Sequence, residues 1–532
     1  MSAPGLLSRL DDRLNPIVVR ELRQAVKSRL VTSVLLLFVS VQVLILGIFL
    51  VVSELNDAPG DIDFRAGARM FLVLQGILLG TCMLLVPGVT GARLGVERSD
   101  NNVDLMFISS LTPRAIVWGK FLSAVVLVLL IFSACAPFMT FTYLLRGIDI
   151  PTILLILAAD FLAVLGGTQL AIFLAAVPAN RALKGVLGIG GFVALVQLFV
   201  FTLMGTVGLV ESGLNVFLDS WEFWGPALAV TAGYLGLVGL VFVWSVAVVS
   251  PPSANRAVLV RAYVLGLWLT TAVIAAVWSR EVGHCGPVYG WVVLSVVLFC
   301  LQLVISICER EAWGPRVART IPRTALLRLP AFLLYSGSAG GVLFSLAGVG
   351  LTLLAGAAWV RTYPALGIAA AWEVLVGPAA AAVALYTLCY CLTAVALRYY
   401  LLGRWAKPMG TWAVALVLVG LGSAGPALAA YFLYYREWGA HARETWWLLP
   451  NPLASVIELM ELRRSASAAH PDYARQCLLF TGVWAGAAAL ACLPWFVRQA
   501  LAFRPPQRGA GAALAADNHR QERGHAALLG RR

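Results

Sequence analysis

Two acidic residues, Asp160 and Glu373, interrupt long apolar stretches of the sequence. A charged group at the centre of a membrane helix costs about 2.5–3.5 kcal/mol, so such a residue faces protein or water and is a candidate for proton relay or substrate contact. It can also serve as a buried hydrogen-bonding group that joins helices. Asp160 lies near the middle of its apolar run, and we expect it inside a helix bundle, protonated or paired, with the structural role favoured. Glu373 lies near the end of its run, close to Arg361, where it can reach the membrane surface.

Recognisable catalytic and cofactor motifs are missing from the sequence. No G-x-x-x-x-G-K-[ST] loop occurs, because Gly119-Lys120 lacks the upstream glycine and is followed by Phe121. HExxH and GxSxG motifs are absent, and the nine cysteines and five histidines form no close cluster with metal-ligand spacing. We therefore expect no catalytic residue, no metal site and no cofactor bound by this chain, which argues against a membrane enzyme.

The composition predicts a membrane protein. Of the 532 residues, 60% are hydrophobic and 12% are charged, whereas soluble domains have about 25% charged residues. Apolar runs of about 20 residues recur, each long enough to cross a bilayer as a helix, and lipid leaves no other partner for the backbone polar groups. We predict an all-α polytopic integral membrane protein with about twelve transmembrane helices. The expected spans are 31–53, 69–91, 119–145, 152–177, 185–210, 226–249, 259–279, 287–307, 332–360, 366–397, 410–435 and 477–497.

The distribution of positive charge predicts the topology. If the N-terminus lies inside, the cytoplasmic pieces hold about 27 of the 39 Lys and Arg residues, as the positive-inside rule requires. Both termini are therefore expected in the cytoplasm. The net charge of +13 then reflects loop orientation, and we expect no nucleic-acid partner. Lys120 and Arg261 lie just inside span ends, from which their side chains can extend to the membrane surface.

Residues 1–30 precede the first span and predict a basic amphipathic helix on the membrane surface. Asn15 caps its start and Pro16 takes the first helical position. One face is apolar and the other carries charged residues that suit anionic lipid headgroups. The charged residues singled out are Arg20, Glu21, Arg23 and Lys27. The alternative is a basic flank that only orients the first span.

The predicted loop 92–118, here called the coupling loop, has a defined pattern. A charged turn is followed by a short helix that is apolar on nearly all sides, which a partner surface would explain. Thr112 then caps a further helix with Pro113 at its first position. The residues singled out are Glu97, Arg98, Asn101, Asn102, Leu105, Met106, Phe107, Leu111, Thr112, Pro113, Gly119 and Lys120. The alternative is a membrane-surface segment without a partner.

Four regions are expected along the chain. These are a cytoplasmic N-terminal helix (1–30), a first six-span core (31–250), a second six-span region (251–497) and a basic disordered cytoplasmic tail (498–532). A short helix is expected at 453–462, in the outer segment before the last span. No convincing sequence repeat relates the halves, and Glu309-Arg310 only faintly echoes Glu97-Arg98.

The first 180 residues resemble the type-2 permease family of ATP-binding cassette (ABC) transporters. The resemblance rests on NPIVVRELRQAVKSR before the first span and VERSDNNVDLMFISSLTPRAIVWGK after the second. The family pattern is matched by Glu97, Arg98, Leu105, Leu111, Thr112, Ile116, Gly119 and Lys120. The chain departs from it at 99–102, where the family commonly has another acidic residue, Gly and Thr.

The resemblance implies a permease subunit of the cell (inner or cytoplasmic) membrane whose coupling loop docks on a separate cytosolic ATPase, which binds ATP and Mg²⁺. It also implies a homodimer or a heterodimer with another permease. Because family members typically have six spans, the chain is either a fused double permease or one permease with added spans, and the weak match of the second half favours added spans. The alternative function is a twelve-span secondary transporter driven by an ion gradient, with Asp160 and Glu373 as its relay residues.

Overall fold

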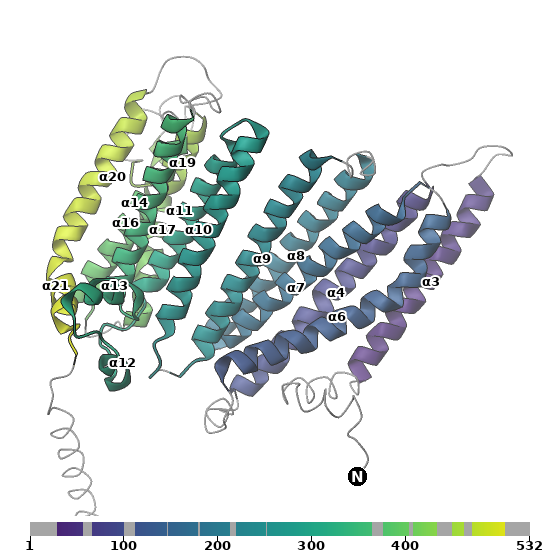
Figure 1. Ribbon diagram of the computed structural model, residues 1–532, viewed down its shortest axis with the longest axis horizontal. Helices are drawn as coiled ribbons and strands as arrows, with labels where there is room; N and C mark the ends of the chain where they lie inside the picture. The colour runs from purple at the N-terminus through teal and green to yellow at the C-terminus, as the bar shows by residue number, and fades with distance from the viewer. Residues whose placement is uncertain are drawn as a thin grey trace, which may run out of the picture. The chain divides into compact units, whose positions relative to one another are not determined.

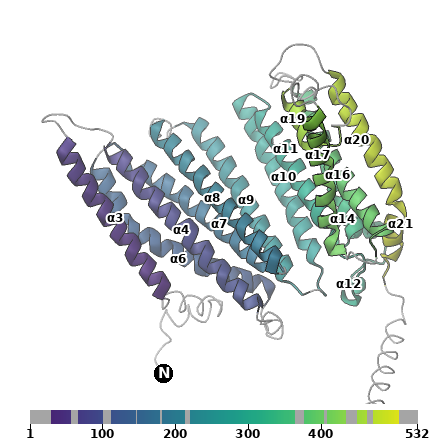
Figure 2. The ribbon, with the colours of Figure 1, turned by 180° about the vertical axis from the view of Figure 1, so that it is seen from behind.

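The computed structural model describes residues 29–56, 66–99, 112–145, 147–178, 181–212, 220–251, 253–363, 376–403, 408–433, 449–461 and 471–505. Across these ranges the regular structure is helical, without a strand. Twelve of the described helices are long and apolar enough to cross a membrane, which confirms the predicted all-α polytopic fold and its number of candidate spans. Figures 1 and 2 show these helices from opposite sides.

The chain forms two compact units, residues Met1–Pro251 and Pro252–Arg532. The described helices of unit 1 are α3 (Arg29–Asn56), α4 (Ala66–Ser99), α6 (Pro113–Leu144), α7 (Ile150–Ala176), α8 (Arg181–Glu211) and α9 (Trp221–Val249). Helix α4 is central, because it packs against α3, α6, α7 and α8. Its fully buried Phe71, Leu74 and Leu78 form part of the apolar core of the unit.

The described residues of unit 2 form six long helices and several short ones. The long helices are α10 (Arg256–Val282), α11 (Gly286–Ser306), α14 (Ser338–Thr362), α16 (Gly377–Tyr400), α17 (Thr411–Leu433) and α20 (Pro471–Ala491). The short helices include α12 (Pro315–Arg319), α13 (Ala325–Leu334), α19 (Pro452–Glu461) and α21 (Leu493–Ala502). Helices α12, α13 and α21 lie at one end of the unit and α19 lies at the other (Figure 1).

Small residues bring α11 and α14 together in unit 2. Gly341 and Gly348 of α14 are both buried. A Cβ atom at Gly348 would overlap the ring of Phe299, and one at Gly341 would overlap Arg261 and Ser306. The missing side chains therefore permit a close approach of the two helices, as small residues commonly do between membrane helices.

The two units use the same pairs of helices for their internal packing. In unit 1, α4 packs on α3, α6 and α7, and α7 packs on α6, α8 and α9. In unit 2, α11 packs in the same way on α10, α14 and α16, and α16 packs on α14, α17 and α20. The third and sixth helices also meet in both units, directly in unit 1 and through α21 in unit 2. Contacts of α3 with α6 and of α4 with α8 belong to unit 1 only, among the pairs with substantial contact.

Several predicted boundaries are wrong. The span expected at 332–360 is divided into α13 and α14 by a break at 335–337, because backbone carbonyls there turn toward Arg261 instead of continuing a helix. Helix α4 continues to Ser99 rather than ending at residue 91. The last expected span, 477–497, is divided at Cys492, where Pro494 of α21 supplies no backbone N–H. Because α21 continues to Ala502, residues 498–502 of the predicted tail are helical.

The segment before α20, which is predicted to lie outside, contains the expected short helix, at Pro452–Glu461 rather than 453–462. Helix α19 follows Asn451, whose side-chain Oδ1 accepts hydrogen bonds from the backbone N–H groups of Leu453 and Ala454, both at 3.1 Å. This is the capping geometry that an Asn-Pro step favours.

Candidate functional site

The described structure reaches both sides of the coupling loop but not its centre. Residues 100–111, with the predicted contact residues Asn101, Asn102, Leu105, Met106, Phe107 and Leu111, lie outside the described residues. Glu97 and Arg98 belong to the last turns of α4. The charged turn predicted there is therefore wrong for residues 97–99, because the helix passes through them before the run of Asp and Asn begins.

The helix start predicted at Thr112 and Pro113 within the coupling loop is confirmed. Thr112 has an extended backbone, and its Oγ1 accepts a hydrogen bond from the Ala115 N–H at 3.3 Å. Pro113 occupies the first turn, where its missing N–H needs no partner. The chain therefore enters α6 through a fixed, capped turn.

Gly119 and Lys120 are buried in α6. The Lys120 side chain is only 2% exposed and lines a small cavity with Thr90 and Arg93 of α4. The prediction that this side chain extends to the membrane surface is therefore wrong. The Lys120 side chain therefore faces α4.

Asp160 lies inside the bundle of unit 1, as its cost in lipid led us to expect. It is fully buried, and its Oδ2 accepts a hydrogen bond from Gln75 Nε2 at 2.8 Å. The same amide also contacts Thr206 Oγ1 at 3.4 Å, so one cluster joins α4, α7 and α8. Asp160 Oδ1 has no hydrogen-bond partner among the described residues. Glu373 and the N-terminal residues Asn15, Pro16, Arg20, Glu21, Arg23 and Lys27 lie outside the described residues.

Two further glutamines make polar contacts in unit 1. Gln42 of α3 donates to the Leu74 carbonyl at 3.2 Å, and Gln169 of α7 donates to Ser245 Oγ of α9 at 3.0 Å. Sequence reasoning missed both residues. Their signal was available, because an uncharged amide within an apolar run is also costly in lipid unless a neighbouring helix supplies a partner.

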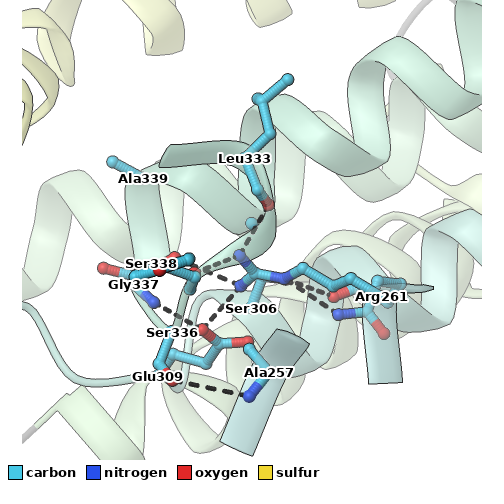
Figure 3. A network of polar contacts seen from close by, with 12 residues as sticks. Ala257, Arg261, Ser306, Glu309, Leu333, Ser336, Gly337, Ser338 and Ala339 are labelled. Carbon is cyan, nitrogen blue, oxygen red and sulfur yellow. Dashed lines mark hydrogen bonds and ion pairs between the residues drawn. The ribbon is translucent and has the colours of Figure 1, made fainter. Parts of the chain in front are cut away.

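Arg261 of α10 is surrounded by acceptors at one end of unit 2 (Figure 3). Its Nη2 lies 2.6 Å from Glu309 Oε2. Its guanidinium donates to the carbonyls of Leu333 at 2.9 Å, Tyr335 at 2.5 Å and Gly337 at 3.3 Å. The Gly337 N–H in turn donates to Glu309 Oε2 at 2.8 Å. The arginine therefore fixes the break between α13 and α14.

The burial of this pair corrects the sequence-based view of Arg261. Its side chain is fully buried, so the expectation that it extends to the membrane surface is wrong. Burial raises the pKa of the Glu309 carboxyl, while the adjacent Arg261 guanidinium acts in the opposite direction. A charge in this position needs a nearby partner of opposite sign, since an isolated buried charge is strongly unfavourable.

A second ion pair lies on the same side of unit 2. Glu311 pairs with Arg398 of α16, and its Oε1 also accepts a hydrogen bond from Trp495 Nε1 of α21 at 2.8 Å. Gln499 of α21 accepts a hydrogen bond from the Ala339 N–H at 3.1 Å. Glu311 therefore ties the segment after α11 to α16 and α21, and Gln499 ties α21 to the start of α14. These contacts hold side chains and backbone in place and provide no nucleophile with an adjacent base.

Comparison with protein-family models, with curated protein sequences and with solved structures gives no match to this chain.

Proposed function

We propose that this chain is the membrane-spanning permease subunit of an ABC transporter of the cell membrane. A separate cytosolic ATPase subunit, which binds ATP and Mg²⁺, drives it to move a substrate across the bilayer. The observation that carries the proposal is the pattern from Glu97 to Lys120, which resembles the coupling loop of type-2 permeases and joins α4 to α6. The twelve candidate spans support a transport role.

The packing of unit 1 is suited to transmitting motion from a partner subunit to the spans. Thr112 caps the start of α6, and Lys120 is buried against α4 about two helical turns further on. Helix α4 in turn packs on α3, α6, α7 and α8. A partner that moves the coupling loop therefore acts on the central helix of the unit, and rigid packing transmits this motion to its neighbours. The N-terminal segment is proposed to lie on the lipid surface.

Site-specific crosslinking tests this proposal. We would place Met106→Cys in the full chain, co-express it with each candidate ABC ATPase subunit of the same organism, and apply a short thiol-to-amine crosslinker. Cys308→Ser serves as the background, because the other native cysteines are buried. The control is Leu453→Cys on α19, an exposed site in the segment predicted outside. We expect an ATPase adduct from Met106→Cys alone, and its absence would contradict the proposal.

A secondary transporter is the second candidate, and Asp160 favours it. A buried carboxylate with one oxygen unpartnered among the described residues is a common feature of proton and ion relays in transporters. Transport that continues after ATP depletion and stops with a proton uncoupler would favour this function. Transport that follows ATP in the presence of the uncoupler would favour the permease.

A further inference from the structure

We infer that unit 2 is a second permease half and that its segment Glu309–Gly337, here called the second loop, is a second docking surface for a cytosolic ATPase subunit. One chain then binds two ATPase copies and needs no second permease. This inference rests on the proposed function.

The internal packing of the two units supports the first part. Six long helices follow one another among the described residues of each unit. Seven pairings between these helices recur in corresponding positions. One of the seven is the contact of α21 with α14, which corresponds to the contact of α9 with α6. Added spans would have no reason to repeat the pairing order of the first six. The packing therefore favours a fused double permease over the added spans that the weak sequence match suggested.

The second loop occupies the place in unit 2 that the coupling loop occupies in unit 1. Each connects the second long helix to the third, α4 to α6 and α11 to α14. A Glu-Arg pair occurs near the end of the second long helix in both units: Glu97-Arg98 lies in the last turns of α4, and Glu309-Arg310 lies just after the end of α11. Because six spans return the chain to the side from which it started, both loops are expected on the cytoplasmic side.

In the second loop, two acidic side chains contact the spans, whereas the arginines of α12 are exposed. Glu309 and Glu311 are both engaged by buried arginines of the spans. In contrast, Arg316 and Arg319 of α12 are exposed, whereas Val317 between them is buried. Helix α12 therefore presents a basic face, to which an acidic surface of the ATPase subunit would be complementary.

The neighbouring helix α13 has a different surface. Leu326 is 87% exposed and Leu329 is 67% exposed, while Phe332 on the other side packs against Phe503. Apolar residues in this amount, on a helix at the end of a set of spans, suit the membrane surface. Helix α12, rather than α13, is thus the part of the second loop that faces the partner.

The second loop is fixed firmly enough to transmit motion. Trp313 Nε1 donates to the Ser336 carbonyl at 2.5 Å, and the Tyr335 hydroxyl donates to the Thr320 carbonyl at 2.9 Å. These bonds close the loop on itself around α12. Glu309 links it to α10, and Glu311 links it to α16 and α21. A force on α12 therefore reaches three helices of the unit.

Native mass spectrometry of the purified complex, released from detergent, tests the stoichiometry. The probe is the full chain co-expressed with the ABC ATPase subunit of the same organism that the crosslinking experiment identifies. We expect one 56.9 kDa chain with two ATPase subunits. An assembly of two chains with two ATPases, or of one chain with one ATPase, overturns the inference and leaves the proposed function intact. A chain that carries no ATPase at all contradicts the proposed function itself.

Charge reversal locates the second surface. The double variant Arg316→Glu, Arg319→Glu changes only exposed side chains, and we expect it to reduce the ATPase copies from two to one, a twofold loss. The control is Arg361→Glu, an exposed arginine at the other end of α14, which should retain two copies. Retention of two copies by the double variant overturns the assignment of α12. The mass of the unmodified complex decides the stoichiometry even if the variant fails to fold.

Discussion

Arg261 and Glu309 form an ion pair of 2.6 Å whose arginine also holds three backbone carbonyls of the break between α13 and α14. The pair joins α10 to the end of α11 and to the start of α14. Because the Arg261 side chain is fully buried and Glu309 is only 16% exposed, the charge of the arginine depends on the nearby carboxylate. This relationship makes the two residues a single structural element.

Removing one member of this pair is expected to destabilise unit 2 by about 3–5 kcal/mol, because the other charge is left buried without a partner. The variants are Arg261→Met and Glu309→Gln, and unfolding of the detergent-solubilised chain followed by circular dichroism is the measurement. The double variant should cost less than the sum of the single variants, since its members are in contact. Strictly additive effects would contradict the pairing.

A methyl group at Gly348 is expected to destabilise the α11–α14 interface by about 1–3 kcal/mol, the usual range for overpacking. The Cβ of Gly348→Ala would overlap Phe299. Gly350→Ala on the same helix is the matched control, because its Cβ would meet nothing within 4 Å, and alanine there should be neutral or slightly stabilising. Thermal unfolding of both variants distinguishes the sites, and equal effects would argue against the close approach of the two helices.

Asp160 separates the two candidate functions. In the permease, Asp160→Asn should keep transport near its original rate, because the amide retains a hydrogen bond with Gln75. Asp160→Leu should cost about 1–3 kcal/mol of stability, since the buried Gln75 amide then loses an acceptor. The measurements are transport in vesicles and thermal unfolding. Loss of transport in a stable Asp160→Asn variant would favour the ion-driven carrier.

Loss of the cap at Thr112 is expected to loosen the first turn of α6. Thr112→Ala removes the acceptor for the Ala115 N–H and should cost about 1 kcal/mol. Hydrogen exchange at the first turn of α6 should speed up by several-fold, and the ATP hydrolysed per substrate moved should rise. Thr112→Ser retains the hydroxyl and is the control. Unchanged exchange in Thr112→Ala would contradict the role of the cap.

The spans and caps could be predicted from sequence because their signals are local. An apolar run of about 20 residues is visible in any window of that length, and the caps at Thr112 and Asn451 depend on residues two or three positions away. The break before α14 was missed for the same reason. Residues 331–335 are apolar, so a hydropathy window extends the span through them, although Arg261 determines the break from another helix.

The polar interiors could be predicted only in part. The burial of Asp160 follows from the cost of its charge in lipid, but its partner Gln75 is 85 residues away in the chain. The burial of Lys120 and Arg261 contradicts a rule that is sound for cations at span ends, because that rule assumes lipid rather than protein around the side chain. The repeated helix pairing of the two units leaves little trace in sequence, since many apolar residues can fill the same contacts.

The Arg261 network also has a consequence for biosynthesis. Glu309 follows Arg261 by 48 residues and Gly337 follows it by 76, so α10 leaves the ribosome before any of these partners exist. Arg261 is the sixth residue of α10, so before these partners exist its side chain can extend to the polar membrane surface. The buried position of the guanidinium can form only after α11 and the start of α14 have been made. The packing of α10 against these later helices is thus expected to be a late step in the assembly of unit 2.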